Sequence, residues 1–175
     1  VHNSSNTEDR IFRIWSDVHL EADLGNMLKE FPDEKGKPGG KYFAARNELR
    51  WGIESGELSS SVDVPRQRIP IRQLWGIYGR YMFVISLPGH GLDCHRTWEA
   101  LALGAIVITI STPLDDLLKP YRVVLIDRRD VHWWKVLSDP NWIRNAFECG
   151  SNGRAVDLSW HGWISSINNK LAVMK

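Results

Sequence analysis

Two glycines, an arginine and a glutamate lie close together in the middle of the chain, and their spacing suits phosphate binding. Gly89 and Gly91 carry no Cβ, so their backbone N–H groups could approach a ligand closely. A helix over 93–103 is predicted to follow, with Asp93 as its N-cap. The first turn of such a helix offers free N–H groups and a positive dipole end. Arg96 lies in that turn and could donate paired hydrogen bonds to phosphate oxygens, so an anion site is predicted.

Arg96 and Glu99 share the side of this helix that faces away from the predicted sheet. The opposite side, which is expected to pack on the sheet, gathers Cys94, Thr97, Trp98 and Leu101. Glu99 lies one turn beyond Arg96, where a carboxylate could accept hydrogen bonds from neighbouring sugar hydroxyls. A solvated helix surface with an i,i+3 ion pair would show the same pattern. The sequence alone leaves both interpretations open.

Other reactive side chains near this turn favour structural roles. His90 and His95 flank Asp93, but no third ligand follows at metal spacing, so no metal site is predicted. Cys94 falls on the core side of the helix and is expected to be a packed thiol rather than a nucleophile. The acidic pair at 115–116 lacks the spacing of a metal-dependent sugar-transfer motif and is expected to decorate a short helix.

The surrounding sequence alternates short apolar runs with helical patterns. Apolar runs predict strands at 11–15, 81–86, 105–110 and 122–126. Helices are predicted at 20–31, 42–53, 70–78, 93–103, 113–119, 130–137 and from 157 onward, with loops at 32–40 and 54–66. Apolar strands that alternate with helices predict an α/β fold, a Rossmann-like three-layer parallel sheet. Ligands of such sheets bind at the carboxyl ends of strands, which indicates the turn after Ser86.

The composition is that of an ordinary globular chain. Its 175 residues, 43% hydrophobic and 25% charged, suffice for one sizeable domain and exclude a disordered or collagen-like chain. A net charge of +1 excludes a strongly basic nucleic-acid binder. Two cysteines are too few for a disulfide framework. No apolar run approaches the roughly 18–20 residues of a membrane span, and the first residues do not resemble a signal peptide. Most of the nine tryptophans are expected in the core.

Residues 86–108, SLPGHGLDCHRTWEALALGAIVI, resemble GT-B glycosyltransferases of the exostosin and ribitol-xylosyltransferase kind. Members of that group carry a strand ending in Ser-Pro-Pro-Gly or similar, a Gly-x-Asp-x-His-Arg-x-Trp-Glu-Ala-Leu helix, and a second strand. The matching residues are Gly91, Asp93, His95, Arg96, Trp98, Glu99, Ala100, Leu101 and Gly104. Val107 stands where members of that group usually have proline, which leaves the shape of the turn into the second strand open. His90 stands where they often have a small polar residue, which leaves the choice of sugar open.

The resemblance implies that the glycine turn and its helix bind the donor of a sugar transfer. Arg96 would bind the donor diphosphate and stabilise it as a leaving group, helped by the amides from Gly89 to Gly91. Glu99 would hold hydroxyls of the ribose or of the donor sugar. The other implied donor-binding residues are Ser16, Ser86, His90, Asp93 and Ser111, and Asp17 would line the cleft beside Ser16. No metal or cofactor is expected, because the nucleotide sugar, of UDP type, is itself a substrate.

The same resemblance implies a single Rossmann-like donor-binding domain over 1–175, the carboxyl-terminal half of a two-domain enzyme. Its first strand, helices and loops would occupy 1–80, the donor motif 81–127 and carboxyl-terminal helices 128–175. The enzyme would transfer xylose, glucuronic acid or N-acetylglucosamine to a glycan acceptor. The acceptor site and the catalytic base would belong to an amino-terminal domain that these residues do not contain. Such an enzyme would be membrane-anchored in the Golgi of a eukaryote, and otherwise cytoplasmic, although no membrane span is predicted within this chain.

Two alternatives remain at this point. One is a non-catalytic Rossmann-like module that binds a nucleotide or a protein partner, which would show saturable binding without donor turnover. The other is a hydrolase acting on phosphate esters or nucleotides, for which turnover would depend on a metal ion.

Overall fold

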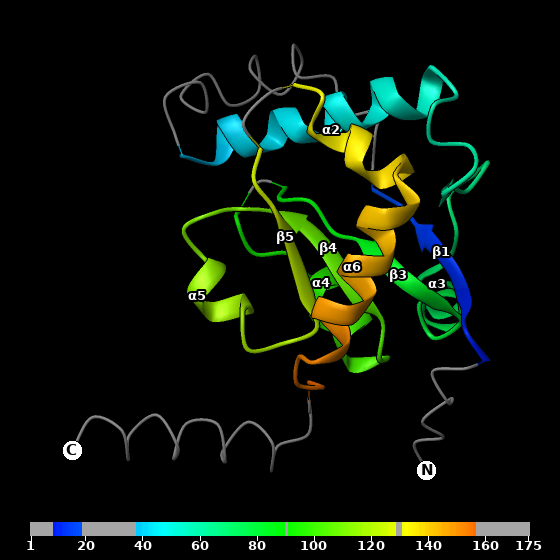
Figure 1. Ribbon diagram of the computed structural model, residues 1–175, viewed down its shortest axis with the longest axis vertical. Coiled ribbons are helices and arrows are strands. Elements are labelled where there is room, and N and C mark those ends of the chain that lie inside the picture. The colour runs from blue at the N-terminus through cyan, green and yellow to red at the C-terminus, as the bar shows by residue number, and fades with distance from the viewer. Residues whose placement is uncertain (1–8, 19–37, 90, 129–130, 157–175) are drawn as a thin grey trace.

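The computed structural model describes residues 9–18, 38–89, 91–128 and 131–156, and it is organised around one parallel β-sheet (Figure 1). The five strands are β1 (Ile11–Trp15), β2 (Val62–Asp63), β3 (Tyr81–Ile85), β4 (Ile106–Ile110) and β5 (Val123–Ile126). They are ordered β2-β1-β3-β4-β5, and every pairing is parallel. The predicted α/β fold with a Rossmann-like parallel sheet is therefore confirmed.

Helices cover both faces of the sheet. They are α2 (Pro38–Glu54), α3 (Ile71–Tyr78), α4 (His95–Ala102), α5 (Asp115–Leu118), the 3₁₀ helix η3 (Trp133–Ser138) and α6 (Pro140–Ser151). Along β4 the side chains alternate between the two faces. Ile106 and Ile108 belong to the core that contains residues of α2, η3 and α6, whereas Val107 packs with residues of α3 and α4. All five residues of β4 are buried, as its continuous apolar run indicates.

Several predicted boundaries were wrong. The loop predicted at 54–66 contains β2, a strand of two residues that is too short to leave an apolar run in the sequence. Helix α2 begins at Pro38, inside the predicted loop at 32–40, because proline suits the first turn of a helix. The helix predicted at 130–137 is described as η3, and α6, which was not predicted, follows it. The helices predicted at 20–31 and from 157 lie outside the described residues.

The direction in which the chain crosses the sheet reverses at β1. From β1 the chain crosses to β2 on one side, and it then returns to β3 on the other side. In open α/β sheets the loops diverge at such a point, and a crevice opens at the carboxyl ends of the strands. The loops that follow β1 and β3 are therefore expected to flank the binding site. No helix among the described residues is long and apolar enough to cross a bilayer.

Candidate functional site

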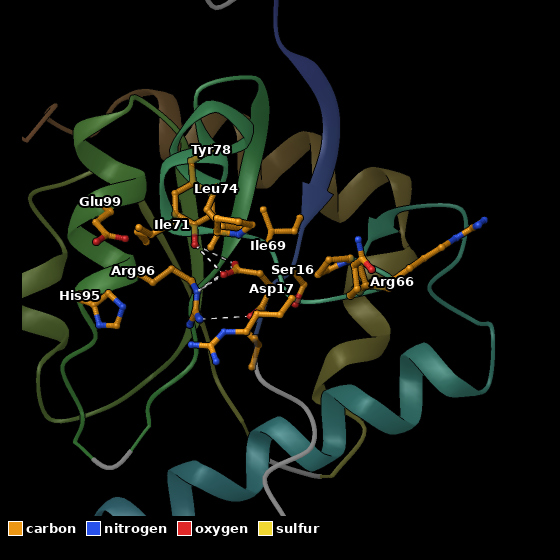
Figure 2. A pocket seen from close by; sticks show the side chains of 16 residues that line it. Ser16, Asp17, Arg66, Ile69, Ile71, Leu74, Tyr78, His95, Arg96 and Glu99 are labelled. Atoms are coloured by element: carbon orange, nitrogen blue, oxygen red, sulfur yellow. Dashed lines mark hydrogen bonds and ion pairs between the residues drawn. The ribbon is translucent and has the colours of Figure 1, made fainter.

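A pocket of about 650 Å³ lies at this reversal point, at the carboxyl ends of β1 and β2 (Figure 2). One wall is the segment 16–18 after β1, a second is the loop 64–70 after β2, and the remainder comes from α3 and α4. Its volume falls within the range of roughly 300–1,000 Å³ that small-molecule sites occupy. The fold thus opens a site of ligand size where the topology predicts one.

Asp17, Tyr78 and Arg96 form a connected polar cluster in this pocket, as the dashed lines of Figure 2 show. The Tyr78 hydroxyl donates to the Asp17 carboxylate at 2.9 and 3.0 Å. Arg96 donates through Nε to the same carboxylate at 3.1 and 3.2 Å. The three residues come from α3, α4 and the segment after β1, so the cluster joins that segment to the two helices.

Arg96 is buried rather than solvated, since its side chain is 12% exposed and that of Asp17 is 9% exposed. Burial is the largest single effect and acts to lower the pKa of Arg96, but Asp17, Cys94 and Tyr78 together outweigh it, so that pKa is raised. Burial, followed by the charge of Asp17, raises the pKa of Tyr78 and keeps its hydroxyl protonated. The cluster therefore holds one guanidinium, one carboxylate and one neutral phenol. The interpretation of Arg96 as part of a solvated helix surface was wrong.

The terminal nitrogens of Arg96 make only weak hydrogen bonds among the described residues. Nη1 lies 3.7 Å from the weak acceptor Cys94 Sγ, and Nη2 lies 3.4 Å from the Asp17 carbonyl oxygen. Asp17 thus holds the Nε side of the guanidinium and leaves its outer edge weakly bonded. That edge has the fork geometry that binds phosphate or carboxylate oxygens.

Two further polar atoms of the pocket are buried without a hydrogen-bond partner among the described residues, Glu99 Oε2 and Ser16 Oγ. Ser16 is 2% exposed as a residue, and both side chains line the pocket. A buried polar atom without a partner costs roughly 1–3 kcal/mol, so sites that retain one commonly receive a ligand or a water there. Glu99 and Ser16 are suited to accept hydrogen bonds from ligand hydroxyls.

The rest of the pocket lining contains many apolar side chains, and its charged lining is mainly positive. The apolar side chains come mostly from the loop after β2 and from α3, and they are Val18, Val64, Pro65, Ile69, Pro70, Ile71 and Leu74. The charged side chains that line it are three arginines, Arg66, Arg68 and Arg96, and two carboxylates, Asp17 and Glu99. The pocket thus offers apolar surface together with polar, mainly positive groups.

Of the residues predicted to bind the donor, Ser16, Arg96 and Glu99 line the pocket, together with Asp17. Ser86 and Ser111 do lie where β3 and β4 end, as predicted, but both hydroxyls are engaged in internal hydrogen bonds. The Ser86 hydroxyl lies 2.9 Å from that of Thr97, and the Ser111 hydroxyl donates to Asp115. Neither serine lines the pocket.

The glycine turn and its cap also differ from the prediction. The Gly89 amide donates to the Gly91 carbonyl at 3.0 Å, so it is not free for a ligand. Helix α4 begins at His95 with Cys94 as N-cap, and Cys94 makes no side-chain cap hydrogen bond. Asp93, the predicted N-cap, instead accepts a hydrogen bond from Trp98 Nε1 at 2.8 Å. His90 lies outside the described residues.

Tyr78 and the loop 64–70 were missed, although both line the pocket. A tyrosine at the end of an amphipathic helix is expected in the core. Only the tertiary fold brings Tyr78 to the carboxylate of Asp17, which lies 61 positions earlier. The two prolines and two arginines of 64–70 were a usable signal, because they indicate a charged loop and binding residues are common on loops. Among the residues described, no group of three or more His, Cys, Asp or Glu side chains could hold a metal ion.

The chain was compared with protein-family models, with curated proteins and with solved structures, and none of them matched. A functional assignment therefore rests on the pocket, on the chemistry of its side chains and on the resemblance carried by residues 86–108.

Proposed function

We propose that this chain is the donor-binding domain of a nucleotide-sugar-dependent glycosyltransferase and that the pocket is its donor site. The observation that carries the proposal is the largely buried Arg96, which Asp17 holds through Nε in the same pocket as Glu99, whose Oε2 has no hydrogen-bond partner among the described residues. A cation with weakly bonded terminal nitrogens and an acceptor of this kind in one pocket suit a ligand that carries both phosphate and hydroxyl groups. A nucleoside diphosphate sugar is such a ligand.

The apolar and the polar groups of the pocket correspond to the two kinds of surface on this ligand. The apolar side chains among residues 64–74 would contact the planar base, and Arg96 would bind the diphosphate. Glu99 and Ser16 would accept hydrogen bonds from hydroxyls of the ribose or of the sugar. Each group of the ligand then meets a surface of matching chemistry, which is the support for a nucleotide sugar over a simpler anion.

In the proposed reaction an acceptor hydroxyl forms a bond to the anomeric carbon while the bond from that carbon to the diphosphate oxygen breaks. Negative charge develops on the departing diphosphate, and Arg96 with the amino-terminal end of α4 would stabilise it. The hydroxyl proton passes to a base, which we place on an acceptor domain outside the described sheet. The role proposed for this chain is thus donor binding and leaving-group stabilisation.

Calorimetric titration of the chain with UDP, GDP and their sugar conjugates tests the proposal. We expect saturable binding of one nucleotide per chain, with UDP preferred, and competition between UDP and its sugar conjugates for one site. Binding without donor turnover, even with an acceptor domain supplied, would favour a non-catalytic module. Metal-dependent release of phosphate would favour a hydrolase, and absence of nucleotide binding would contradict the proposal.

Glu99→Gln is expected to weaken UDP-sugar binding about fivefold without lowering the melting temperature. An amide keeps the size of the side chain but accepts a weaker hydrogen bond than a carboxylate does, a difference of about 1 kcal/mol. Because Glu99 Oε2 is buried without a hydrogen-bond partner among the described residues, replacing the carboxylate by an amide is not expected to destabilise the free protein. Calorimetry and thermal unfolding measure the two effects. Glu57→Gln, at an exposed position in the turn before β2, is the control, and equal affinities in both variants would return Glu99 to a structural role.

The chain alone is expected to bind the donor but not to transfer its sugar. Transfer requires the acceptor hydroxyl and a base near the anomeric carbon, in a closed site that excludes water. Incubation with UDP- and GDP-sugars and simple glycoside acceptors, followed by mass spectrometry, measures both new glycan and released nucleotide. Efficient transfer by these 175 residues would show that the acceptor site and the base lie within them.

A further inference from the structure

Arg46, a residue of α2, reaches the turn that leads from β3 into α4. Its Nε donates to the Pro88 carbonyl at 2.7 Å, and its Nη2 donates to the Leu87 carbonyl at 3.2 Å. A Cβ built on Gly89 would lie 2.9 Å from the same Nη2. The absence of a side chain at Gly89 therefore leaves the space that the guanidinium fills, and Arg46 packs directly against the turn.

The guanidinium of Arg46 also lies within electrostatic reach of the pocket cluster. Burial, followed by the nearby charge of Arg96, lowers the pKa of Arg46, while Cys94 and Asp17 act in the opposite direction. Asp17 thus lies within electrostatic reach of two guanidiniums and accepts hydrogen bonds from that of Arg96. Arg46 adds a fourth arginine to the three that line the pocket, against two carboxylates among the described lining residues. Arg46 and Arg96 are less exposed than Arg66 and Arg68, so their charges are the less screened ones.

We propose that Arg46 is a positioning residue of the phosphate site and that it makes the pocket select diphosphates over monophosphates. The inference rests on the proposed function, since it assigns the phosphate end of that ligand. Arg46 acts in two ways: it holds the turn 87–89 through two carbonyls, and it adds a second positive charge within electrostatic reach of Arg96. It does not line the pocket, so it acts through the field and through the turn rather than by contact.

A field effect has a signature that a purely structural role does not have, because it grows with the charge of the ligand. Uridine is neutral, and UMP and UDP carry successively more negative charge. The second guanidinium should therefore favour UDP most and uridine not at all. A loss of turn geometry alone would weaken all three ligands to a similar extent.

The experiment compares the parent chain with R46Q and R50Q by calorimetric titration with uridine, UMP and UDP. In R46Q the UDP affinity is expected to fall about tenfold and the UMP affinity about threefold, with uridine unchanged. R50Q removes the same charge from the same helix at the more exposed Arg50–Glu54 pair, and a change of less than about twofold is expected. R46K, which keeps the charge, is expected to restore most of the preference for UDP over UMP.

The outcomes separate this inference from the function on which it rests. If parent and R50Q bind UDP and R46Q binds it equally well, or if R46Q weakens all three ligands equally, the inference alone is overturned. If the parent binds no nucleotide, the proposed function is contradicted, and so is the inference that rests on it. Should R46Q fail to fold by circular dichroism, G89A provides the test, because its Cβ displaces the guanidinium without removing its charge. G89A is then expected to reduce the preference for UDP over UMP, and an unchanged preference would overturn the inference.

Discussion

Replacing Arg96 by alanine is expected to lower the affinity for UDP about ten- to a hundredfold, a loss of roughly 1.5–3 kcal/mol. This is the size of one charge-assisted hydrogen-bonding group, and the long contacts of the terminal nitrogens leave that group available in the free protein. Asp17 already orients the guanidinium, so little conformational freedom remains to be lost on binding. Calorimetric titration of the parent and the variant with UDP measures the effect.

The substitution also removes the cation from the buried Asp17, so folding must be measured separately. Arg96→Lys keeps the charge but loses the planar fork, and its affinity is expected between those of the parent and the alanine variant. Arg72→Ala, on the exposed side of α3, is the matched control and should bind UDP as the parent does. Equal UDP affinities in parent and Arg96→Ala, with both proteins folded, would remove Arg96 from the proposed site.

The part of the site that could be predicted from the sequence is the part that local pattern determines. Strand β4 and the inward side of α4 follow from apolar periodicity, and Thr97 and Leu101 are buried as that periodicity indicates. The same periodicity places Arg96 away from the sheet, and this much is correct. The periodicity does not indicate whether the outward side of α4 contacts solvent or another segment, because that depends on the packing of elements that are remote in the sequence.

The rest of the site depends on contacts between remote segments. Asp17 and Arg96 are 79 positions apart, and Tyr78 joins them from a third element. The local sequence of Arg96 does not distinguish Glu99 from Asp17 as its ion-pair partner. An i,i+3 pair with Glu99 was therefore one of the two interpretations left open by the sequence. The glycine turn shows the same limit: glycines there were expected to open the backbone to a ligand. At Gly89 the missing side chain makes room for Arg46 of α2.

A separate prediction concerns stability, at a buried ion pair on the other face of the sheet. Glu48 of α2 is 4% exposed and accepts hydrogen bonds from Arg128 Nε at 2.6 Å, from Arg128 Nη2, and from Trp133 Nε1 at 2.9 Å. The hydrogen bonds to Glu48 outweigh burial and raise the pKa of Arg128. One carboxylate thus joins α2 to the segment after β5 and to η3, and its loss would leave two donors without their acceptor.

Glu48→Ala is expected to lower the free energy of unfolding by about 3 kcal/mol, within the roughly 3–5 kcal/mol typical of breaking a buried pair. For a chain of this size that corresponds to a fall of about 6–12 °C in melting temperature. Thermal and urea unfolding measure the change.

The control is Glu54→Ala, which removes a carboxylate from the same helix at a more exposed pair with Arg50. The free energy of unfolding is expected to change by less than about 0.5 kcal/mol in this variant. If the cost comes from Arg128 losing this carboxylate, adding Arg128→Met to Glu48→Ala should recover part of the lost stability. If the double variant is no more stable than Glu48→Ala, the loss is assigned to the Trp133 hydrogen bond and to packing. If Glu48→Ala and Glu54→Ala are equally stable, the buried pair contributes no more to stability than a surface pair does.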